Sequence, residues 1–256
     1  LVGSEMCIRD SHSSGISYID IANGNLTFRQ TTDDGDIIFQ SVVGEESGGC
    51  GTLANIVKGY RADAAIILEP TSLKLSPIQS GALTFRLIVH GKATHASMRW
   101  DGVSAVEKYA DLHHAIIDFE KQRHHSFNTK HYKSKDRVAP INIGTIKAGQ
   151  WHSTVPESII AEGRLGVFPN ESNEEARKNF EDHVFEFSKS DSWLAENPPE
   201  IEWFEGQFES GQTPIDDPLI KELIEHKGKT SLAFREKMAE KNFKLTSDYD
   251  LSIFKS

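Results

Sequence analysis

Residues 36–49, DIIFQSVVGEESGG, and residues 64–70, AAIILEP, decide how this chain folds. Each stretch is a short apolar run, typical of a buried strand, that ends in glutamate and turn-forming residues. Between them, residues 52–58 predict a brief helix that Gly59 ends, because glycine readily adopts the left-handed conformation of a helix terminus. Strand, helix and strand over this length predict a βαβ unit with parallel strands, and therefore an α/β fold built on a parallel sheet.

Glutamates follow both strands. In open α/β sheets, ligands bind beyond the carboxyl ends of the strands, which predicts that Glu45, Glu46 and Glu69 converge on one pocket. Carboxylates held close together repel each other and persist only where a proton or a metal ion offsets their charge. The sequence therefore predicts a hydrolytic metal site.

Composition limits the classes of function. The 256 residues carry a formal net charge of −10, which argues against the basic surface that nucleic-acid binding requires. No apolar run approaches the roughly 20 residues that span a bilayer. The two cysteines make no disulfide framework, so a cytoplasmic location is expected. Residues 1–11, LVGSEMCIRDS, lack the pattern of a signal peptide and are expected to be a non-native leader, and both ends of the sequence are expected to be cut.

A second pattern begins near residue 80. Apolar residues alternate with polar ones over residues 83–89, which predicts a half-buried strand. A helix is expected over residues 102–122 with Asp101 as its N-cap, and strands are expected over residues 138–146 and 158–168. The buried stripe expected on this helix consists of Val103, Val106, Ala110 and Ile117.

Ser172 and Glu175 have the spacing of a capping box at the start of a second helix. Its expected buried stripe includes Phe180 and Val184, and residues 200–204 predict a last strand. The order β-α-β-β-α-β predicts a ferredoxin-like domain inserted into the α/β domain. The expected domains are residues 12–79, the first part of the α/β domain; residues 80–205, the inserted domain; and residues 206–256, the second part.

Five segments carry a family resemblance: SVVGEESGGCGT (41–52), AAIILEPT (64–71), HGKATHAS (90–97), DGVSAVEK (101–108) and STVPE (153–157). In this order they resemble the zinc-dependent amidohydrolases and peptidases of the acetylornithine deacetylase and succinyl-diaminopimelate desuccinylase type, which include carboxypeptidases and dipeptidases. The resemblance implies a catalytic α/β domain with two zinc ions, for which cobalt or manganese are alternatives. It also implies that the inserted domain is a lid that forms a homodimer.

The resemblance assigns roles to the acidic residues. Glu45 corresponds to the general base and Glu46 to a zinc ligand, and a glycine-flanked turn supplies the different directions that these two roles need. Glu69 corresponds to the second terminal carboxylate ligand. Asp20, in the segment DIANGN, resembles the carboxylate that bridges the two metals, and an ordinary turn aspartate is the alternative. Two histidine ligands of the family have no counterpart here, so this chain is expected to bind zinc poorly, and an inactive chain is left open as an alternative.

Three further residues correspond to groups that contact substrate. His95 matches the lid histidine that reaches the partner subunit's active site and stabilises the oxyanion of the tetrahedral intermediate. Arg164 lies where the family places a substrate-binding arginine, whose fork suits a carboxylate, although an ordinary surface ion pair is the alternative. Asn142 occupies the like position on the preceding strand.

The interpretation with most support is a metal-dependent hydrolase that cleaves the amide bond of N-acyl amino acids, of the deacetylase or desuccinylase type. A dipeptidase or aminopeptidase with the same chemistry is an alternative, and so is a non-catalytic dimerising fragment or degenerate paralogue. The expected substrate is a small N-acyl amino acid or dipeptide, with neither nucleic acid nor membrane as a partner.

Overall fold

The structure is a computed structural model that describes residues 4–9, 18–22, 25–32, 35–46, 48–69, 71, 74–129, 131–132 and 134–229. The chain divides into two compact units, and each is described by itself. The first consists of residues 1–72 and 78–212 and holds three sheets, of five, four and two strands. The second consists of residues 73–77 and 213–256.

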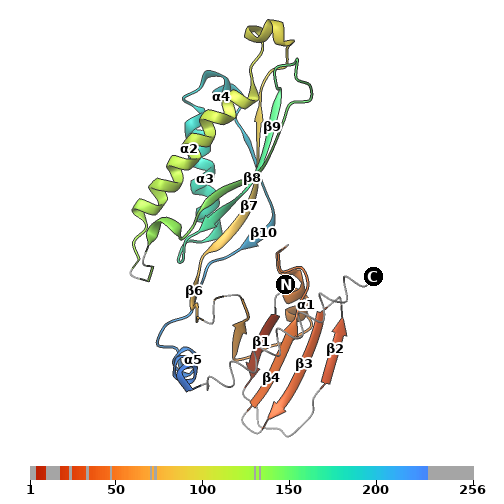
Figure 1. Ribbon diagram of the computed structural model, residues 1–256, viewed down its shortest axis with the longest axis vertical. Coiled ribbons are helices and arrows are strands. Elements are labelled where there is room, and N and C mark those ends of the chain that lie inside the picture. The colour runs from red at the N-terminus through yellow and green to blue at the C-terminus, as the bar shows by residue number, and fades with distance from the viewer. Residues whose placement is uncertain are drawn as a thin grey trace. The chain divides into compact units, whose positions relative to one another are not determined.

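The first sheet contains five strands in the order β2-β3-β4-β1-β5 (Figure 1). Its members are β1 (Ser4–Arg9), β2 (Tyr18–Ala22), β3 (Asn25–Thr32), β4 (Gly35–Ser41) and β5 (Ala64–Ile67). Every neighbouring pair is antiparallel. The prediction of a parallel sheet is therefore wrong. Only two residues separate β2 from β3 and β3 from β4, and so short a connection joins only antiparallel strands.

β4 and β5 nevertheless run in the same direction, because each is antiparallel to β1, which lies between them. Glu5 of β1 pairs with Gln40 of β4 on one side and with Ile67 of β5 on the other. The carboxyl ends of β4 and β5 therefore lie at the same edge of the sheet, as predicted. The strand between β4 and β5 is β1, which belongs to residues 1–11. The identification of residues 1–11 as a non-native leader stays a prediction.

Helix α1 (Cys50–Val57) connects the two strands. Gly59 follows it with φ 95°, the left-handed conformation expected of the residue that ends this helix. The helix buries Gly51 and Asn55 and leaves Leu53, Ile56 and Val57 exposed.

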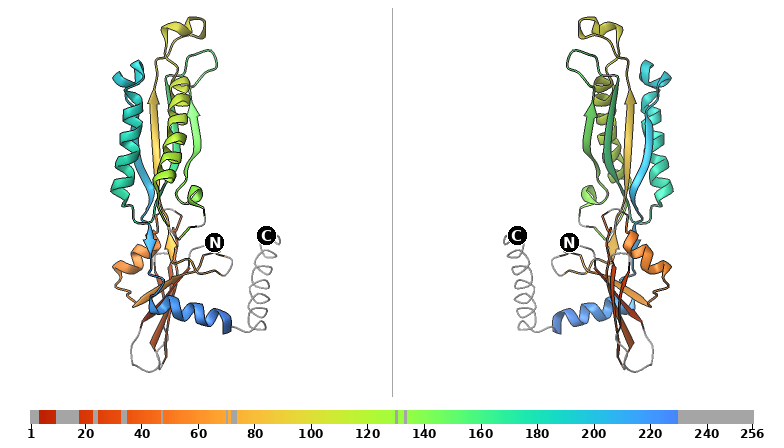
Figure 2. Two further views of the ribbon diagram at one scale, coloured as in Figure 1. Left: turned by 90° about the vertical axis from the view of Figure 1, so that its left-hand side faces the viewer. Right: turned by 90° about the vertical axis from the view of Figure 1, so that its right-hand side faces the viewer.

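The second sheet contains four strands in the order β10-β7-β9-β8, all antiparallel. They are β7 (Gly81–His90), β8 (Ile141–Ala148), β9 (Ser158–Val167) and β10 (Glu200–Phe208). Helices α2 (Ala105–Ser126) and α3 (Asn173–Ser188) lie on one side of this sheet (Figures 1 and 2). The predicted order of elements, β-α-β-β-α-β, is observed. Shorter elements are η1 (Ala96–Asp101), η2 (Lys135–Arg137), α4 (Ser192–Glu196) and the pair β6 (Ile78–Gln79) and β11 (Gly211–Gln212).

The core of this part lies between the sheet and the two helices. Residues of β7 alternate between buried and partly exposed, so that Leu83, Phe85, Leu87 and Val89 all face the helices. Phe85 packs on Phe180 of α3 with ring centroids 4.7 Å apart. The stripe predicted on α3 is confirmed, since Ala176, Phe180 and Val184 are fully buried and Phe187 packs against them.

The start of α2 differs from the prediction. The N-cap is Ser104, whose hydroxyl accepts a hydrogen bond from Glu107 N, and Asp101 instead ends η1. The predicted stripe is also wrong, because Val106 and Ile117 are exposed. A different set of apolar residues on α2 is buried against the sheet: Ala105, Tyr109, Leu112, Ile116 and Phe119.

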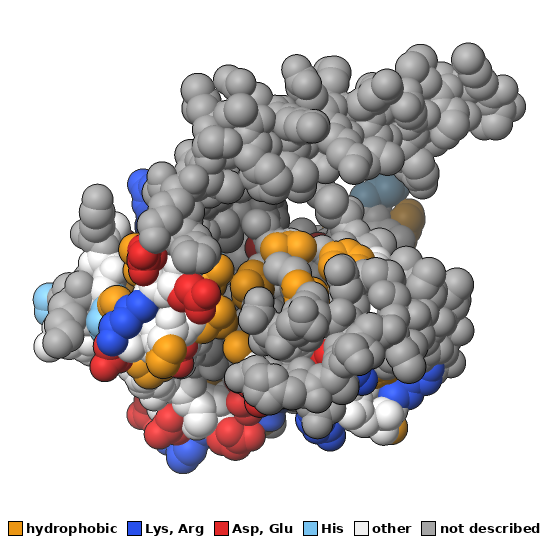
Figure 3. Space-filling model, turned by 90° about the horizontal axis from the view of Figure 1, so that it is seen from below, with side chains coloured by type: hydrophobic (Ala, Val, Ile, Leu, Met, Phe, Trp, Pro, Cys, Tyr) orange, Lys and Arg blue, Asp and Glu red, His pale blue; other side chains and the backbone are white. Residues whose placement is uncertain are grey.

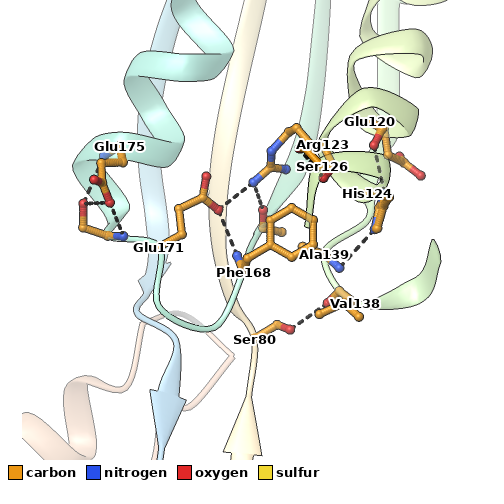
Figure 4. Close-up of polar contacts among 12 residues, drawn as sticks. Ser80, Glu120, Arg123, His124, Ser126, Val138, Ala139, Phe168, Glu171 and Glu175 are labelled. Atoms are coloured by element: carbon orange, nitrogen blue, oxygen red, sulfur yellow. Dashed lines mark hydrogen bonds and ion pairs between the residues drawn. The ribbon is translucent and has the colours of Figure 1, made fainter. Parts of the chain in front are cut away.

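Polar side chains fix the far end of α2 to the loops around β8 and β9 (Figure 4). Arg123 is 8% exposed, and its Nη2 donates to Gly166 O at 3.0 Å and to Glu171 Oε2 at 2.8 Å. Its guanidinium lies 4.8 Å from the centre of the Phe168 ring. Burial lowers the pKa of Arg123, and the charge of Glu171 opposes that effect. This network holds the end of β9 in place.

The second unit contains helix α5 (Pro218–Lys229). Within the part of the chain that the structure describes, no helix is both long and apolar enough to cross a membrane. Figure 3 shows hydrophobic side chains among charged ones on one face of the chain.

Candidate active site

Glu45 and Glu46 lie in a tight turn between β4 and α1. Gly49 N donates to Gly44 O at 2.9 Å and closes the turn. Gly44 and Gly49 have φ of 69° and 71°, a conformation that residues with a side chain rarely adopt. The predicted glycine-flanked turn is therefore present, and it carries the two adjacent carboxylates between its glycines.

A buried amide that the sequence did not single out supports this turn. Asn25, at the start of β3, is 2% exposed. Its Oδ1 accepts from Val43 N at 3.1 Å, and its Nδ2 donates to Gly51 O at 2.7 Å and to Asn55 Oδ1 at 3.2 Å. Asn25 thus joins the end of β4 to the first turn of α1, on either side of Glu45 and Glu46. Because the three partners are far from it in sequence, no local pattern indicates this role.

The three predicted glutamates interact electrostatically. Glu69 is exposed and lies two residues beyond the end of β5, at the same edge of the sheet as Glu45. Burial raises the pKa of Glu45, and the charges of Glu46 and Glu69 raise it further. The charge of Arg164 acts in the opposite direction. A carboxyl with a raised pKa among other carboxylates is suited to accept and release a proton.

Asp20 lies in the middle of β2, and its backbone pairs with Thr27 of β3. β2 and β5 are the two outermost strands, on opposite sides of the five-stranded sheet. With neighbouring strands about 4.8 Å apart, β2 and β5 are roughly 19 Å apart. The strand order therefore does not bring Asp20 beside Glu69, and its assignment as the bridging ligand stays a prediction.

The described residues do not fit a complete zinc site. Among them, no three His, Cys, Asp or Glu side chains are arranged to hold a metal ion. The donors that do come together are all carboxylates, which favour harder cations than zinc.

His95 lies at the N-cap of η1, in a loop built from three of the quoted segments. Ala96 N donates to Ser153 O at 2.9 Å, and Val155 N donates to Thr94 O at 2.9 Å. The segments 92–97 and 153–157 therefore pair with each other directly. The His95 side chain is exposed, and the ring of Trp151 lies 6.2 Å from it in an edge-on arrangement.

Arg164 and Asn142 are direct partners across the β8–β9 pair. Cross-strand partners share one face of a sheet, so both residues lie on the face away from the helices. Both are exposed, and Arg164 makes no ion pair among the described residues. Glu162 lies two residues before Arg164 on β9. It forms an ion pair with Arg86 instead, with Arg86 Nη2 2.8 Å from Glu162 Oε1. The surface ion pair that was the alternative for Arg164 is thus absent from the described part of the chain.

A pocket of about 800 Å³ lies at the ends of α2 and α3, beside the residues of Figure 4. Its carboxylates already have partners: Glu171 binds Arg123, Glu175 completes the capping box with Ser172, and Asp182 binds Lys178. None of the predicted site residues lines it. These three carboxylates therefore have structural roles.

Comparison with known proteins agrees with the quoted segments. Residues 78–191 match the peptidase dimerisation domain of M20 peptidases. An N-formyl-4-amino-5-aminomethyl-2-methylpyrimidine deformylase from Bacillus subtilis is 31% identical over 179 residues, 66% of this chain and 41% of that protein. A peptidase M20 domain-containing protein from Schizosaccharomyces pombe is 32% identical over 139 residues, 53% of this chain and 31% of that protein.

An aminopeptidase structure from Bacillus cereus aligns with a TM-score of 0.46 and 16% identity, covering 86% of this chain and 66% of that one. The chain spans less than half the length of the two curated relatives. Both belong to families of hydrolytic enzymes by name. Residues 78–191 are therefore similar to the M20 peptidase dimerisation domain, and over the matched region the chain resembles M20 peptidases and amidohydrolases.

Proposed function

We propose that the protein hydrolyses the amide bond of a small N-acyl amino compound. The observation that carries this proposal is Glu45, whose pKa is raised by burial and by Glu46 and Glu69 in a turn that Asn25 holds in place. A protein similar to this family with a carboxyl so placed has the general base that amide hydrolysis requires.

In the proposed reaction, Glu45 removes a proton from the water that attacks the acyl carbonyl carbon. The carbon–nitrogen bond then breaks, and Glu45 delivers the same proton to the leaving amine. His95 donates a hydrogen bond to the oxyanion of the tetrahedral intermediate, an interaction worth roughly 3 kcal/mol in preorganised sites. We propose that this histidine comes from the partner subunit of a homodimer, with the four-stranded domain as the lid.

N-acyl amino acids are the substrate class that the sheet face favours. Arg164 has no ion-pair partner among the described residues, and Asn142 is its cross-strand neighbour. Together they offer a guanidinium fork and an amide to a substrate carboxylate.

The relatives support a second candidate. The Bacillus subtilis protein is named as a deformylase of an aminopyrimidine, and deformylation is also amide hydrolysis. An N-formyl amine is therefore the alternative substrate class, followed by a dipeptide.

Similarity to the M20 family supports a metal cofactor without identifying the metal. Glu46 and Glu69 are its proposed carboxylate ligands, and Asp20 is left out of the proposed set because the strand order separates it from Glu69. In this family a metal supplies polarisation of the carbonyl and acidification of water.

The experiment compares hydrolysis of N-acetyl, N-succinyl and N-formyl substrates, with zinc, cobalt or manganese added, by the chain and by Glu45→Gln. We expect Glu45→Gln to lower kcat by roughly 10²–10⁴-fold, the usual effect of a general base. The matched control is Glu186→Gln, which removes an exposed carboxylate that pairs with Lys189 in the described part of the chain. Turnover unaffected by Glu45→Gln would refute the role of Glu45. Absence of turnover with every substrate and metal would favour the non-catalytic alternative.

A further inference from the structure

The His95 side chain has an unusual local partner, the residue two positions later. Ser97 N donates to His95 Nδ1 at 3.2 Å, and Ser97 Oγ lies 2.8 Å from the same nitrogen. A backbone N–H can only donate, so Nδ1 must accept and cannot carry a proton while this bond is present. In the neutral ring the proton is therefore on Nε2.

This tautomer is the one that oxyanion stabilisation needs. Nε2 makes no hydrogen bond within the described part of the chain, and the ring is exposed. Nε2–H is thus a free donor. A ring with its proton on Nδ1 would instead present a lone pair to an oxyanion and would repel it.

The backbone beneath the ring is held independently. His95 and Thr154 form an isolated antiparallel bridge, and Ala96 N donates to Ser153 O. Loss of the Ser97 hydroxyl therefore leaves the loop backbone supported and changes mainly the environment of Nδ1.

We propose that Ser97 is a positioning residue that fixes the Nε2–H tautomer and the orientation of His95. Ser97 acts through His95 and does not itself contact substrate. The inference rests on the proposed function, because only a reaction with an oxyanion gives this tautomer a purpose.

The test uses the full chain labelled with ¹⁵N in its histidines, with His95→Gln to assign the signal. Long-range ¹H–¹⁵N correlation distinguishes Nδ1 and Nε2 tautomers of a neutral imidazole. We expect an Nε2–H tautomer in the unmodified chain. We expect a mixture of tautomers in Ser97→Ala, because the backbone bond of 3.2 Å is at the long end of hydrogen-bond distances and is too weak to hold Nδ1 as an acceptor without the hydroxyl at 2.8 Å. Ser97→Thr keeps the hydroxyl and should restore the single tautomer. The matched control is Ser190→Ala, which removes a hydroxyl that binds Phe187 O in another loop.

Kinetics supply the second readout. Ser97→Ala should lower kcat about tenfold with KM unchanged, as for the loss of one neutral hydrogen bond, and Ser97→Thr should recover it. An unchanged tautomer in Ser97→Ala overturns the inference. A changed tautomer in a chain that hydrolyses none of the substrates supports the positioning role and refutes the proposed function instead.

Discussion

We expect the ion pair between Arg123 and Glu171 to contribute measurably to stability. Their side chains are 8% and 15% exposed, and Arg123 Nη2 also donates to Gly166 O, two residues beyond Arg164 on β9. Arg123→Met keeps most of the apolar stem and removes the charge, which leaves Glu171 buried with Phe168 N as its remaining donor. Breaking a buried pair in this way costs about 3 kcal/mol.

The assay is chemical denaturation followed by circular dichroism, with thermal unfolding in parallel. For a chain of this size a loss of about 3 kcal/mol corresponds to a melting temperature lower by roughly 6–12 °C. Removing both partners with Arg123→Met and Glu171→Gln should cost less than the sum of the single changes, with a coupling energy of about 2 kcal/mol. Lys178→Met, which breaks an ion pair whose side chains are 72% and 62% exposed, is the matched control and should cost under about 1 kcal/mol. A loss as small for Arg123→Met as for this control would refute the reasoning.

Three further changes test other parts of the structure. The pKa of Glu45 in the folded protein is raised above its ordinary value of 4.5. Above pH 4.5 the folded protein therefore binds more protons than the unfolded chain, and its stability falls as the pH rises from 4.5 through the pKa of the folded state. Glu45→Gln should therefore be more stable than the unmodified chain at pH 7 and equally stable near pH 3; denaturation at both pH values measures this, and no difference at pH 7 would contradict it. Asn25→Asp can still accept from Val43 N but cannot donate to Gly51 O, so denaturation should show a loss of about 2 kcal/mol; an unchanged midpoint would show that the amide does not hold the turn. Burial raises the pKa of Tyr109 to about 12, and its hydroxyl has no partner in the described part of the chain. Tyr109→Phe should leave stability unchanged at pH 7 and weaken the fall in stability above pH 10, and a destabilised variant at pH 7 would indicate a hydrogen bond to that hydroxyl.

Local patterns predicted the four-stranded domain well. Alternation over residues 83–89 and the Ser172–Glu175 spacing each depend on neighbours in sequence, and both are present as predicted. The start of α2 was predicted at the wrong residue, yet a local signal existed. Ser104 and Glu107 have the same spacing as Ser172 and Glu175, and Ser104 is the observed N-cap.

The first sheet was harder to predict, because its strand order is not a local property. Nothing within residues 36–70 indicates that β1 lies between β4 and β5. The hairpin of β2 and β3 did carry a signal, since Asn23-Gly24 between alternating apolar residues favours a two-residue turn. The common edge for Glu45 and Glu69 was predicted for a partly wrong reason. It requires only that β4 and β5 run in the same direction, and an intervening antiparallel strand preserves this.

The most direct test of whether Glu45 and Glu69 lie at the same end of the first sheet is a titration. It compares the Glu45 carboxyl of the unmodified chain with that of Glu69→Gln. Carbon-13 NMR of labelled glutamate follows this group, with Glu45→Gln assigning its signal. The charge of Glu69 raises the pKa of Glu45, so its removal should lower that pKa, and removal of the Arg164 charge by Arg164→Met should raise it. A Glu45 pKa that stays the same when Glu69 becomes glutamine would contradict the account, because the two carboxylates would then lie too far apart to form one site.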